Sequence, residues 1–320
     1  LEKVKHDAAA LEKNEALIMA SRLELDYLHY LNMPDISEED LINRHYSLNT
    51  ALSNLGNLYE QSALYELLTH RIIFKGSVRT SSQKTSLNDL VFTEQNLVRK
   101  ASTSFEAQKH HLLFQSAFLM AVGDEQSASD VLMQLNRLIT EYPAIGNPLF
   151  YLAIIENMLE NLRETRRYDQ IPVFIERLAA ISHPSQMVMM HISALAGLYR
   201  LLLLLDRGEF HKAKEFIDRS EVLQPSSIEK LNPVLESKIS LYVALVHIGL
   251  KDYRRARKTL VLAMLNKTCD LPIHRILRIT GLIIHHKMND SDYIYSESRS
   301  IKREIAKSGK AYRMESLILD

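Results

Sequence analysis

The sequence has little of what disulfide-bonded, metal-binding or β-rich proteins depend on. Its single cysteine, Cys269, excludes an intrachain disulfide and a cysteine-based zinc site, and it favours a reducing compartment, so we expect a cytoplasmic protein. Only 9 glycines and 8 prolines occur in 320 residues, fewer turn-forming residues than a β-sandwich or barrel needs. With 39 basic and 39 acidic residues, the chain has no net charge that would attract nucleic acid as a whole.

An initiator methionine is also missing. The chain begins Leu-Glu-Lys, which indicates a fragment or a processed form, so the lack of a signal peptide says nothing about the full-length protein. One apolar run, residues 187–205, has the length of a membrane span. His191 and Arg200 interrupt it, and an arginine near a helix centre costs about 2.5–3.5 kcal/mol on insertion. We therefore expect a buried helix and no membrane span.

The motifs of known catalytic and nucleotide-binding sites are absent too. The sequence has no Gly-rich dinucleotide or phosphate loop, no Gly-x-Ser-x-Gly and no His-Glu-x-x-His. The pairs His110–His111 and His285–His286 are neighbours in sequence, and neighbours on a helix point about 100° apart, so neither pair can share a metal ion unaided. We predict a non-enzymatic protein without a metal or cofactor.

What the sequence does contain is an internal repeat. Phe210 opens the pattern Phe-x-x-Ala-x-x-x-Ile, and Tyr253 opens Tyr-x-x-Ala-x-x-x-Leu. Tyr168 and Glu125 take the same position, so the four anchors are separated by 43, 42 and 43 residues. Such offsets trace one stripe of an α-helix, and another apolar helical segment precedes each. We predict helix pairs whose second helices begin near these anchors, with Ala213 and Ala256 at helix–helix contacts.

The repeats resemble a known family. RGEFHKAKEFIDRSEVLQP, residues 207–225, is similar to the second half of a tetratricopeptide repeat, as is LKDYRRARKTLVLAM, residues 250–264. The first halves lack the family's Trp and Leu-Gly positions, and the period is about 42 residues instead of about 34. The resemblance covers residues 106–265. It implies an all-α fold, a right-handed superhelical solenoid of antiparallel helix pairs.

These patterns divide the chain into three predicted segments. Residues 1–75 carry apolar positions at helical spacing and are predicted to form three or four helices that cap the array. Residues 76–86, GSVRTSSQKTS, are predicted to be a polar loop, with Ser86 as a helix cap. Residues 87–320 are predicted to hold the tetratricopeptide-like repeats, the last of them degenerate.

Solenoids usually bind a peptide or helix on a concave surface lined by the first helices of each pair. We therefore predict a protein-interaction scaffold whose partner is a protein or peptide. Glu156 and Glu160 also suit metal or acid–base chemistry, but no Glu-x-x-His partners accompany them. Repeat register assigns eight side chains to the groove: His110, Leu113, Glu156, Glu160, Leu198, Leu202, Lys238 and Leu241.

Two other functions stay open. The chain is alternatively a peptide-sensing regulatory module of a larger signalling or transcription protein, in which a ligand in the groove changes the curvature. Nucleic-acid binding through a basic C-terminal face is the less favoured alternative, because no nucleic-acid motif accompanies that face. The face consists of Arg299, Lys302, Arg303, Lys307 and Lys310.

Charge is unevenly distributed along the chain. Residues 1–70 hold 12 acidic and 5 basic residues, whereas residues 251–320 hold 15 basic and 8 acidic ones. Opposite charges on different segments attract across copies, and salt screens that attraction. Three interpretations stay open: both segments are ordinary solvated faces, which is the favoured one; copies of the chain associate weakly head to tail; or each segment selects an oppositely charged partner. Increasing salt would weaken the self-association.

Overall fold

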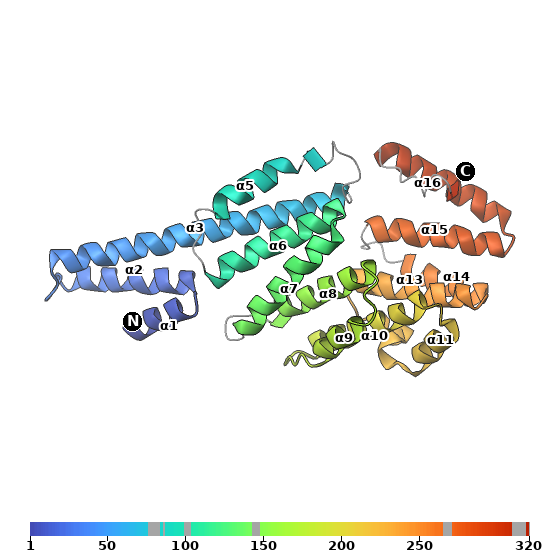
Figure 1. Ribbon diagram of the computed structural model, residues 1–320, viewed down its shortest axis with the longest axis horizontal. Helices are drawn as coiled ribbons and strands as arrows, with labels where there is room; N and C mark the ends of the chain where they lie inside the picture. Colours follow the sequence, from blue (N-terminus) through green and yellow to red (C-terminus); the bar gives the residue numbers. More distant parts are fainter. Residues whose placement is uncertain are drawn as a thin grey trace. The chain divides into compact units, whose positions relative to one another are not determined.

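The computed structural model describes residues 1–75, 84–85, 87–98, 104–142, 148–264, 271–308 and 318–319 (Figure 1). These residues are mainly helical and contain no β-strand, which confirms the all-α prediction and agrees with a sequence rich in Leu, Ala, Glu and Lys. The predicted polar loop at 76–86 lies almost wholly outside the described residues, as do Ser86 and Cys269. The chain divides into two compact units, unit 1 (Leu1–Arg166) and unit 2 (Arg167–Asp320).

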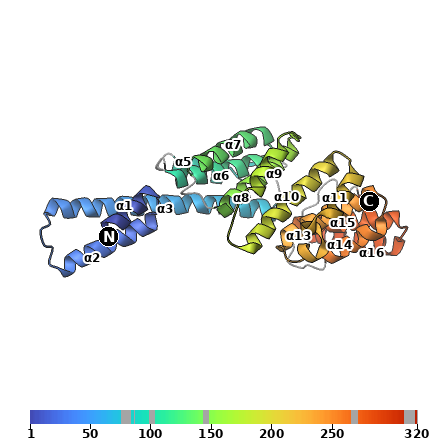
Figure 2. The same ribbon diagram turned by 90° about the horizontal axis from the view of Figure 1, so that it is seen from below.

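Unit 1 is built from antiparallel helices. Residues 1–75 form three of them, where the apolar spacing predicts three or four. Figures 1 and 2 show α2 and α3 joined as a long hairpin, with α1 against α2 and with α6 beside the second half of α3. The helices are α1 (Glu2–Ala10), α2 (Asn14–Tyr30), α3 (Glu38–Lys75), α5 (Asn88–Val98), α6 (Phe105–Val122), α7 (Glu125–Glu141) and α8 (Pro148–Glu164).

A shared ion-pair cluster holds the first three helices together. The carboxylate of Glu24 on α2 accepts from the ammonium of Lys5 on α1 at 2.6 Å and from the guanidinium of Arg44 on α3. Glu24 and Lys5 are largely buried, where such charge-assisted bonds are stronger than on the surface. Further along α3, Leu64 and Leu68 pack against α5 and α6 and form the core of the unit's other end.

Local capping residues define the α6–α7 turn. The hydroxyl of Ser104 accepts from the backbone N–H of Ala107, 3.2 Å away, at the start of α6. Gly123 ends α6 with a φ of 78°, a left-handed conformation that glycine adopts without steric cost. Asp124 then caps α7 by accepting from the N–H of Ser127 at 3.2 Å. Gly123 and Asp124 thus end one helix and begin the next without a longer loop, and α6 and α7 pack against each other.

Unit 2 consists of successive helix pairs in contact. The pairs α10–α11, α13–α14 and α15–α16 follow one another, and each contacts the next. The core between α13, α14 and α15 includes Ala244, Ala256 and Ala263, whose small side chains let helices approach closely. The helical elements of unit 2 are α9 (Ile171–Ala179), α10 (Gln186–Asp206), α11 (Phe210–Arg219), the 3₁₀ turn η1 (Glu221–Leu223), α12 (Pro225–Ile228), α13 (Pro233–Gly249), α14 (Tyr253–Met264), α15 (Leu271–Lys287) and α16 (Ser291–Ser308).

The predicted second helices begin close to the repeat anchors. Helices α7, α11 and α14 start at Glu125, Phe210 and Tyr253, as predicted, and Ala213 and Ala256 are fully buried. Helix α9 is the exception, since it starts at Ile171 after a turn over 168–170. Pro172 explains the shift, because proline has no N–H to donate and is favoured in the first helical turn.

Helix α10 contains the apolar run that raised the membrane question. It has 21 residues and is long and apolar enough to cross a bilayer, and 50% of its most apolar window is buried inside unit 2. Leu195, Leu198 and Tyr199 are among the buried side chains, and Arg200 is exposed. A core helix passes the same test of length and composition, so α10 by itself assigns no membrane span.

Candidate functional site

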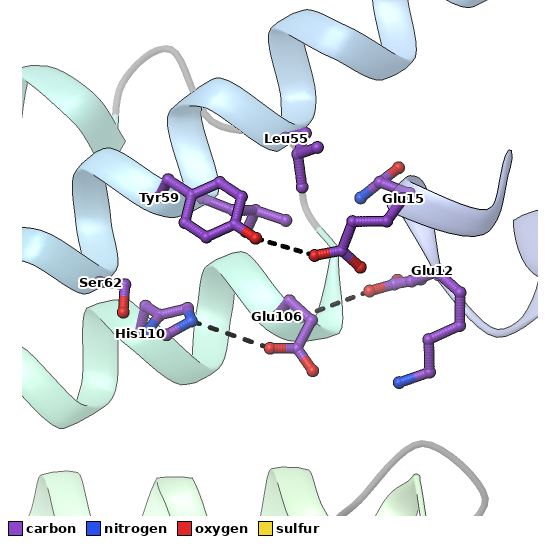
Figure 3. A pocket seen from close by; sticks show the side chains of 10 residues that line it. Glu12, Glu15, Leu55, Tyr59, Ser62, Glu106 and His110 are labelled. Atoms are coloured by element: carbon purple, nitrogen blue, oxygen red, sulfur yellow. Dashed lines mark hydrogen bonds and ion pairs between the residues drawn. The ribbon is translucent and has the colours of Figure 1, made fainter. Parts of the chain in front are cut away.

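A cavity of about 250 Å³ in unit 1 brings several carboxylates together (Figure 3). We call it the acidic pocket. Its walls come from the α1–α2 turn, from the middle of α3 and from the first turns of α6. The lining residues are Glu12, Lys13, Asn14, Glu15, Leu55, Leu58, Tyr59, Ser62, Glu106 and His110.

Glu12 anchors the α1–α2 turn to the start of α6. The backbone of Glu12 has a φ of 53°. The Glu12 carboxylate accepts from the backbone N–H groups of Phe105 at 3.0 Å and Glu106 at 3.3 Å. These N–H groups have no partner within their own helix, and the positive end of the helix dipole favours an anion there. Glu12 therefore acts as a cap supplied from a distant part of the chain and fixes one wall of the pocket.

Glu15 and Tyr59 form the exposed rim of the pocket. The Tyr59 hydroxyl donates to the Glu15 carboxylate at 2.9 Å, which links α2 to α3 (Figure 3). This hydrogen bond, together with the negative charge of Glu15, raises the pKa of Tyr59 above its ordinary value. The phenol therefore stays a neutral donor, and the Glu15 carboxylate has further lone pairs for another donor.

His110 and Glu106 lie on one face of α6, four residues apart. The His110 Nε2 is 3.8 Å from a Glu106 carboxylate oxygen, and Glu106 also pairs with Lys109. Burial lowers the pKa of His110, and the charge of Lys109 lowers it further, while Glu106 and Glu66 oppose that shift. The ring is thus neutral at neutral pH, so the pocket presents mainly negative charge.

A pocket of this composition suits a cationic group. Carboxylates bind guanidinium and ammonium groups through charge-assisted hydrogen bonds. In the part of the chain that the structure describes, no three His, Cys, Asp or Glu side chains are arranged to hold a metal ion.

The residues predicted from the repeat register are divided between the two units, four in each. His110 lines the acidic pocket. Glu156 and Glu160 lie half-buried on α8, where both interact with other residues, and Glu160 is 3.9 Å from Arg163. Lys238 lies half-buried on α13 in unit 2 and also has a partner.

The four leucines predicted to line a groove are core residues. Leu113, Leu198, Leu202 and Leu241 are all buried, none more than 5% exposed, so the expectation that they face an accessible surface is wrong. The reason is that α10 and α13 each contact three or more neighbouring elements. A first helix enclosed in this way is apolar on several faces, and repeat register alone does not distinguish its core face from its open face.

The basic C-terminal face is only partly described. Arg299, Lys302 and Arg303 are exposed on α16, Lys307 lies in its last turn, and Lys310 falls outside the described residues. Two acidic residues of the same helix are engaged with α15: Glu297 and Glu304 pair with Arg278, and Glu304 also pairs with Arg275.

Sequence reasoning missed most of the acidic pocket. Glu12, Glu15, Tyr59 and Glu106 come from three segments far apart in the chain, and none belongs to a motif. The one signal in the sequence was the excess of acidic residues in positions 1–70. Only the folding of the α1–α2 turn onto α6 converts that excess into a site.

A second cavity, of about 340 Å³, lies in unit 2 among α11, α12, α13 and α14. Its floor includes His247 and Val243 of α13, both buried. Burial lowers the pKa of His247, and its Nδ1 atom has no hydrogen-bond partner. Charged residues of both signs line the cavity, among them Arg255 and Lys258 on α14 and Glu229 beyond α12, so it shows no preference for one charge.

Comparison with known proteins gives no match: neither a family model, nor a curated protein, nor a solved structure is similar to this chain. The geometry of the two units is therefore the basis for assigning a function.

Proposed function

We propose that this chain is a non-enzymatic protein-interaction scaffold whose acidic pocket receives a basic side chain of a partner protein. The observation that carries the proposal is the convergence of Glu12, Glu15 and Glu106 on one small cavity. Glu12 already accepts from two backbone N–H groups, and Glu15 and Glu106 each accept from one side chain, which fixes the position of each carboxylate. An ionised carboxylate has about four acceptor sites, so each retains capacity for a guanidinium or ammonium group.

The size of the pocket supports a side chain rather than a whole small molecule. Its volume of about 250 Å³ is below the range of about 300–1,000 Å³ typical of small-molecule sites. The carboxylates also serve a structural purpose, since Glu12 caps α6 and Glu15 links α2 to α3. Groups that hold helices in place while facing a cavity are suited to positioning a bound cation.

The same proposal includes the finer architecture. We take the helix pairs over residues 106–264 as tetratricopeptide-like units that stack into a right-handed superhelix. Support comes from helix starts at Glu125, Ile171, Phe210 and Tyr253, and from the ordered contacts of successive pairs in unit 2. Repeats of this kind bury their faces on neighbours and leave other surfaces for partners.

A panel of labelled peptides tests the binding function. The peptides share one sequence and differ at a central position, which is Arg, Lys, Gln or Glu, and fluorescence anisotropy gives their affinities for the full chain. We expect the Arg and Lys peptides to bind more tightly, and Glu15→Lys to weaken them about tenfold or more. Glu176→Lys, a change at an exposed residue of α9, is the matched control. Equal affinities for all four peptides, or no effect of Glu15→Lys, would contradict the proposal.

The two alternatives predict different results. A peptide-sensing regulator would bind the same peptides and would also change the activity of an attached domain, so the domain content of the full-length gene separates it from a passive scaffold. Nucleic-acid binding through Arg299, Lys302 and Arg303 would give a gel shift whose affinity falls steeply with salt.

A further inference from the structure

Helix α2 has two apolar faces, and only one of them is covered. Ala20 and Leu25 are buried on the covered face. On the other face Met19, Leu23, Tyr27 and Tyr30 are 66%, 56%, 60% and 81% exposed. Scattered exposed apolar side chains are ordinary on a protein surface, whereas a contiguous row of them marks a surface that binds something.

These four side chains form one stripe. They are separated by four, four and three residues, and side chains at such spacings are neighbours on the surface of a helix. At about 1.5 Å per residue the stripe is about 17 Å long, which corresponds to about three turns of a partner helix. Tyr and Met are also enriched in the contact regions of protein interfaces.

The stripe leads into the acidic pocket. Glu15 precedes Met19 by four residues, so it continues the same row and forms the pocket rim at the start of α2. The adjoining carboxylates of Glu12 and Glu106 are part of the same pocket, and residues 1–70 as a whole are strongly acidic. The surface is therefore apolar along its length and negative at one end.

We propose that the partner is an amphipathic helix that lies along α2, with its apolar side chains on Met19, Leu23, Tyr27 and Tyr30 and a lysine or arginine in the acidic pocket. This inference rests on the proposed function and names the class of partner. Charge complementarity selects the occupant, because the negative pocket attracts a basic helix and repels an acidic helix, a nucleic acid or an anionic membrane. Apolar side chains at helical spacing match the stripe as in other helix–groove complexes.

A designed peptide measures this fit. It is a labelled helix with three leucines in a row, separated by four and three residues, and with an arginine one turn beyond each end of the row. Three comparison peptides each change one property: serine replaces the leucines, glutamate replaces the arginines, or a central proline breaks the helix. We expect the parent peptide to bind the full chain at least tenfold more tightly than each of the three.

Variants of the chain locate the binding surface. Leu23→Ser with Tyr27→Ser removes the middle of the stripe, and both residues are exposed, so the fold is expected to persist; far-ultraviolet circular dichroism checks this. We expect the double variant to weaken the parent peptide about tenfold or more. Tyr295→Ser, at a residue 73% exposed on α16, is the matched control and is expected to leave the affinity unchanged.

The results distinguish this inference from the function on which it rests. Suppose the proline-containing peptide binds as well as the parent, and Leu23→Ser with Tyr27→Ser has no effect while Glu15→Lys still weakens binding. The helix on α2 is then ruled out, and the basic side chain in the pocket is retained. If Glu15→Lys also has no effect, both the helix on α2 and the basic side chain in the pocket are ruled out. If the double variant abolishes a salt-resistant dimer of the chain itself, a second copy occupies the stripe and the proposed partner is wrong.

Discussion

The aromatic ring of Phe210, at the start of α11, occupies the space that a side chain at Gly249 would require. Gly249 is the last residue of α13, so the contact joins two consecutive helix pairs of unit 2. The nearest atoms to a Cβ built at this glycine all belong to the Phe210 ring. This close approach gives Phe210 a physical role: its ring packs on the last residue of α13, where only a hydrogen atom fits.

Gly249→Ala is expected to destabilise the protein by about 1–3 kcal/mol, because the added methyl group overpacks this contact. Urea denaturation followed by circular dichroism measures the change. Gly56→Ala is the matched control, since a Cβ at Gly56, within α3, meets nothing within 4 Å. There alanine is expected to stabilise the helix by about 0.5–1 kcal/mol.

A double-mutant cycle tests the cause. If the ring of Phe210 is what excludes a side chain at position 249, Gly249→Ala should cost less in a Phe210→Ala background, with a coupling of about 1 kcal/mol or more. If the effects of the two substitutions add, the Phe210 ring is not the cause of the destabilisation by Gly249→Ala.

The repeat pattern predicted a large part of the fold and little of the site. Phe210 and Tyr253 begin helices as predicted because small and apolar residues at helical spacing specify a local structure. Glu12 and Phe105, by contrast, meet across 93 residues, and no local pattern encodes such a contact. Leu198 shows the other limit: a leucine at the expected register is buried, because its surroundings depend on every helix packed around it.

Glu12→Ala is expected to destabilise the protein by about 0.5–2 kcal/mol, the usual effect of removing a helix cap. The N–H groups of Phe105 and Glu106 lose the carboxylate that accepts from them, so hydrogen exchange at both amides should accelerate. Glu12→Gln keeps an acceptor and loses only the charge, so its effect should be smaller. Glu15→Ala, which removes no backbone hydrogen bond in the structure, is the control and should change stability by less than about 0.5 kcal/mol. Equal effects of the two alanine variants would contradict the capping role.

Gln61→Leu is expected to stabilise the protein by about 1–3 kcal/mol. Gln61 lies in α3, is 3% exposed, and neither its amide nitrogen nor its amide oxygen has a hydrogen-bond partner. Burying an amide without a hydrogen-bond partner costs free energy, and a leucine of similar volume avoids that cost because it has no polar group. Gln95→Leu, at an exposed position of α5, should change the unfolding free energy little. A destabilised Gln61→Leu would mean that the amide is engaged in solution.

Protonation of buried histidines is expected to make the protein less stable in mild acid. Burial lowers the pKa of His247 below its ordinary value; Asp252 and Asp218 oppose the shift, and Lys214 and Arg255 add to it. In the unfolded chain the imidazole titrates near about pH 6.5. As the pH falls through that value the unfolded chain binds more protons than the folded chain, so the free energy of unfolding decreases.

His247→Leu should therefore flatten the loss of stability between about pH 7.5 and about pH 5.5. Burial also lowers the pKa of His110, so part of the pH dependence of stability should remain in His247→Leu. Urea midpoints at the two pH values measure the effect, with His211→Leu as a control at an exposed residue of α11. An unchanged pH dependence in His247→Leu would show that this ring contributes nothing to it.

Self-association of the chain is expected to be weak and to decrease with salt. Residues 1–70 carry 12 acidic and 5 basic residues, and residues 251–320 carry 15 basic and 8 acidic ones, so the acidic segment of one copy attracts the basic segment of another. The screening length falls from about 10 Å at 0.1 M salt to about 3 Å at 1 M, so sedimentation velocity across this range should show dissociation as salt increases. Arg299→Gln with Arg303→Gln, at two exposed positions of α16, should weaken the association at low salt. Leu23→Ser with Tyr27→Ser should leave it unchanged, because this association depends on charge and not on the apolar stripe of α2. A monomer at every salt concentration, even at high protein concentration, would refute the prediction.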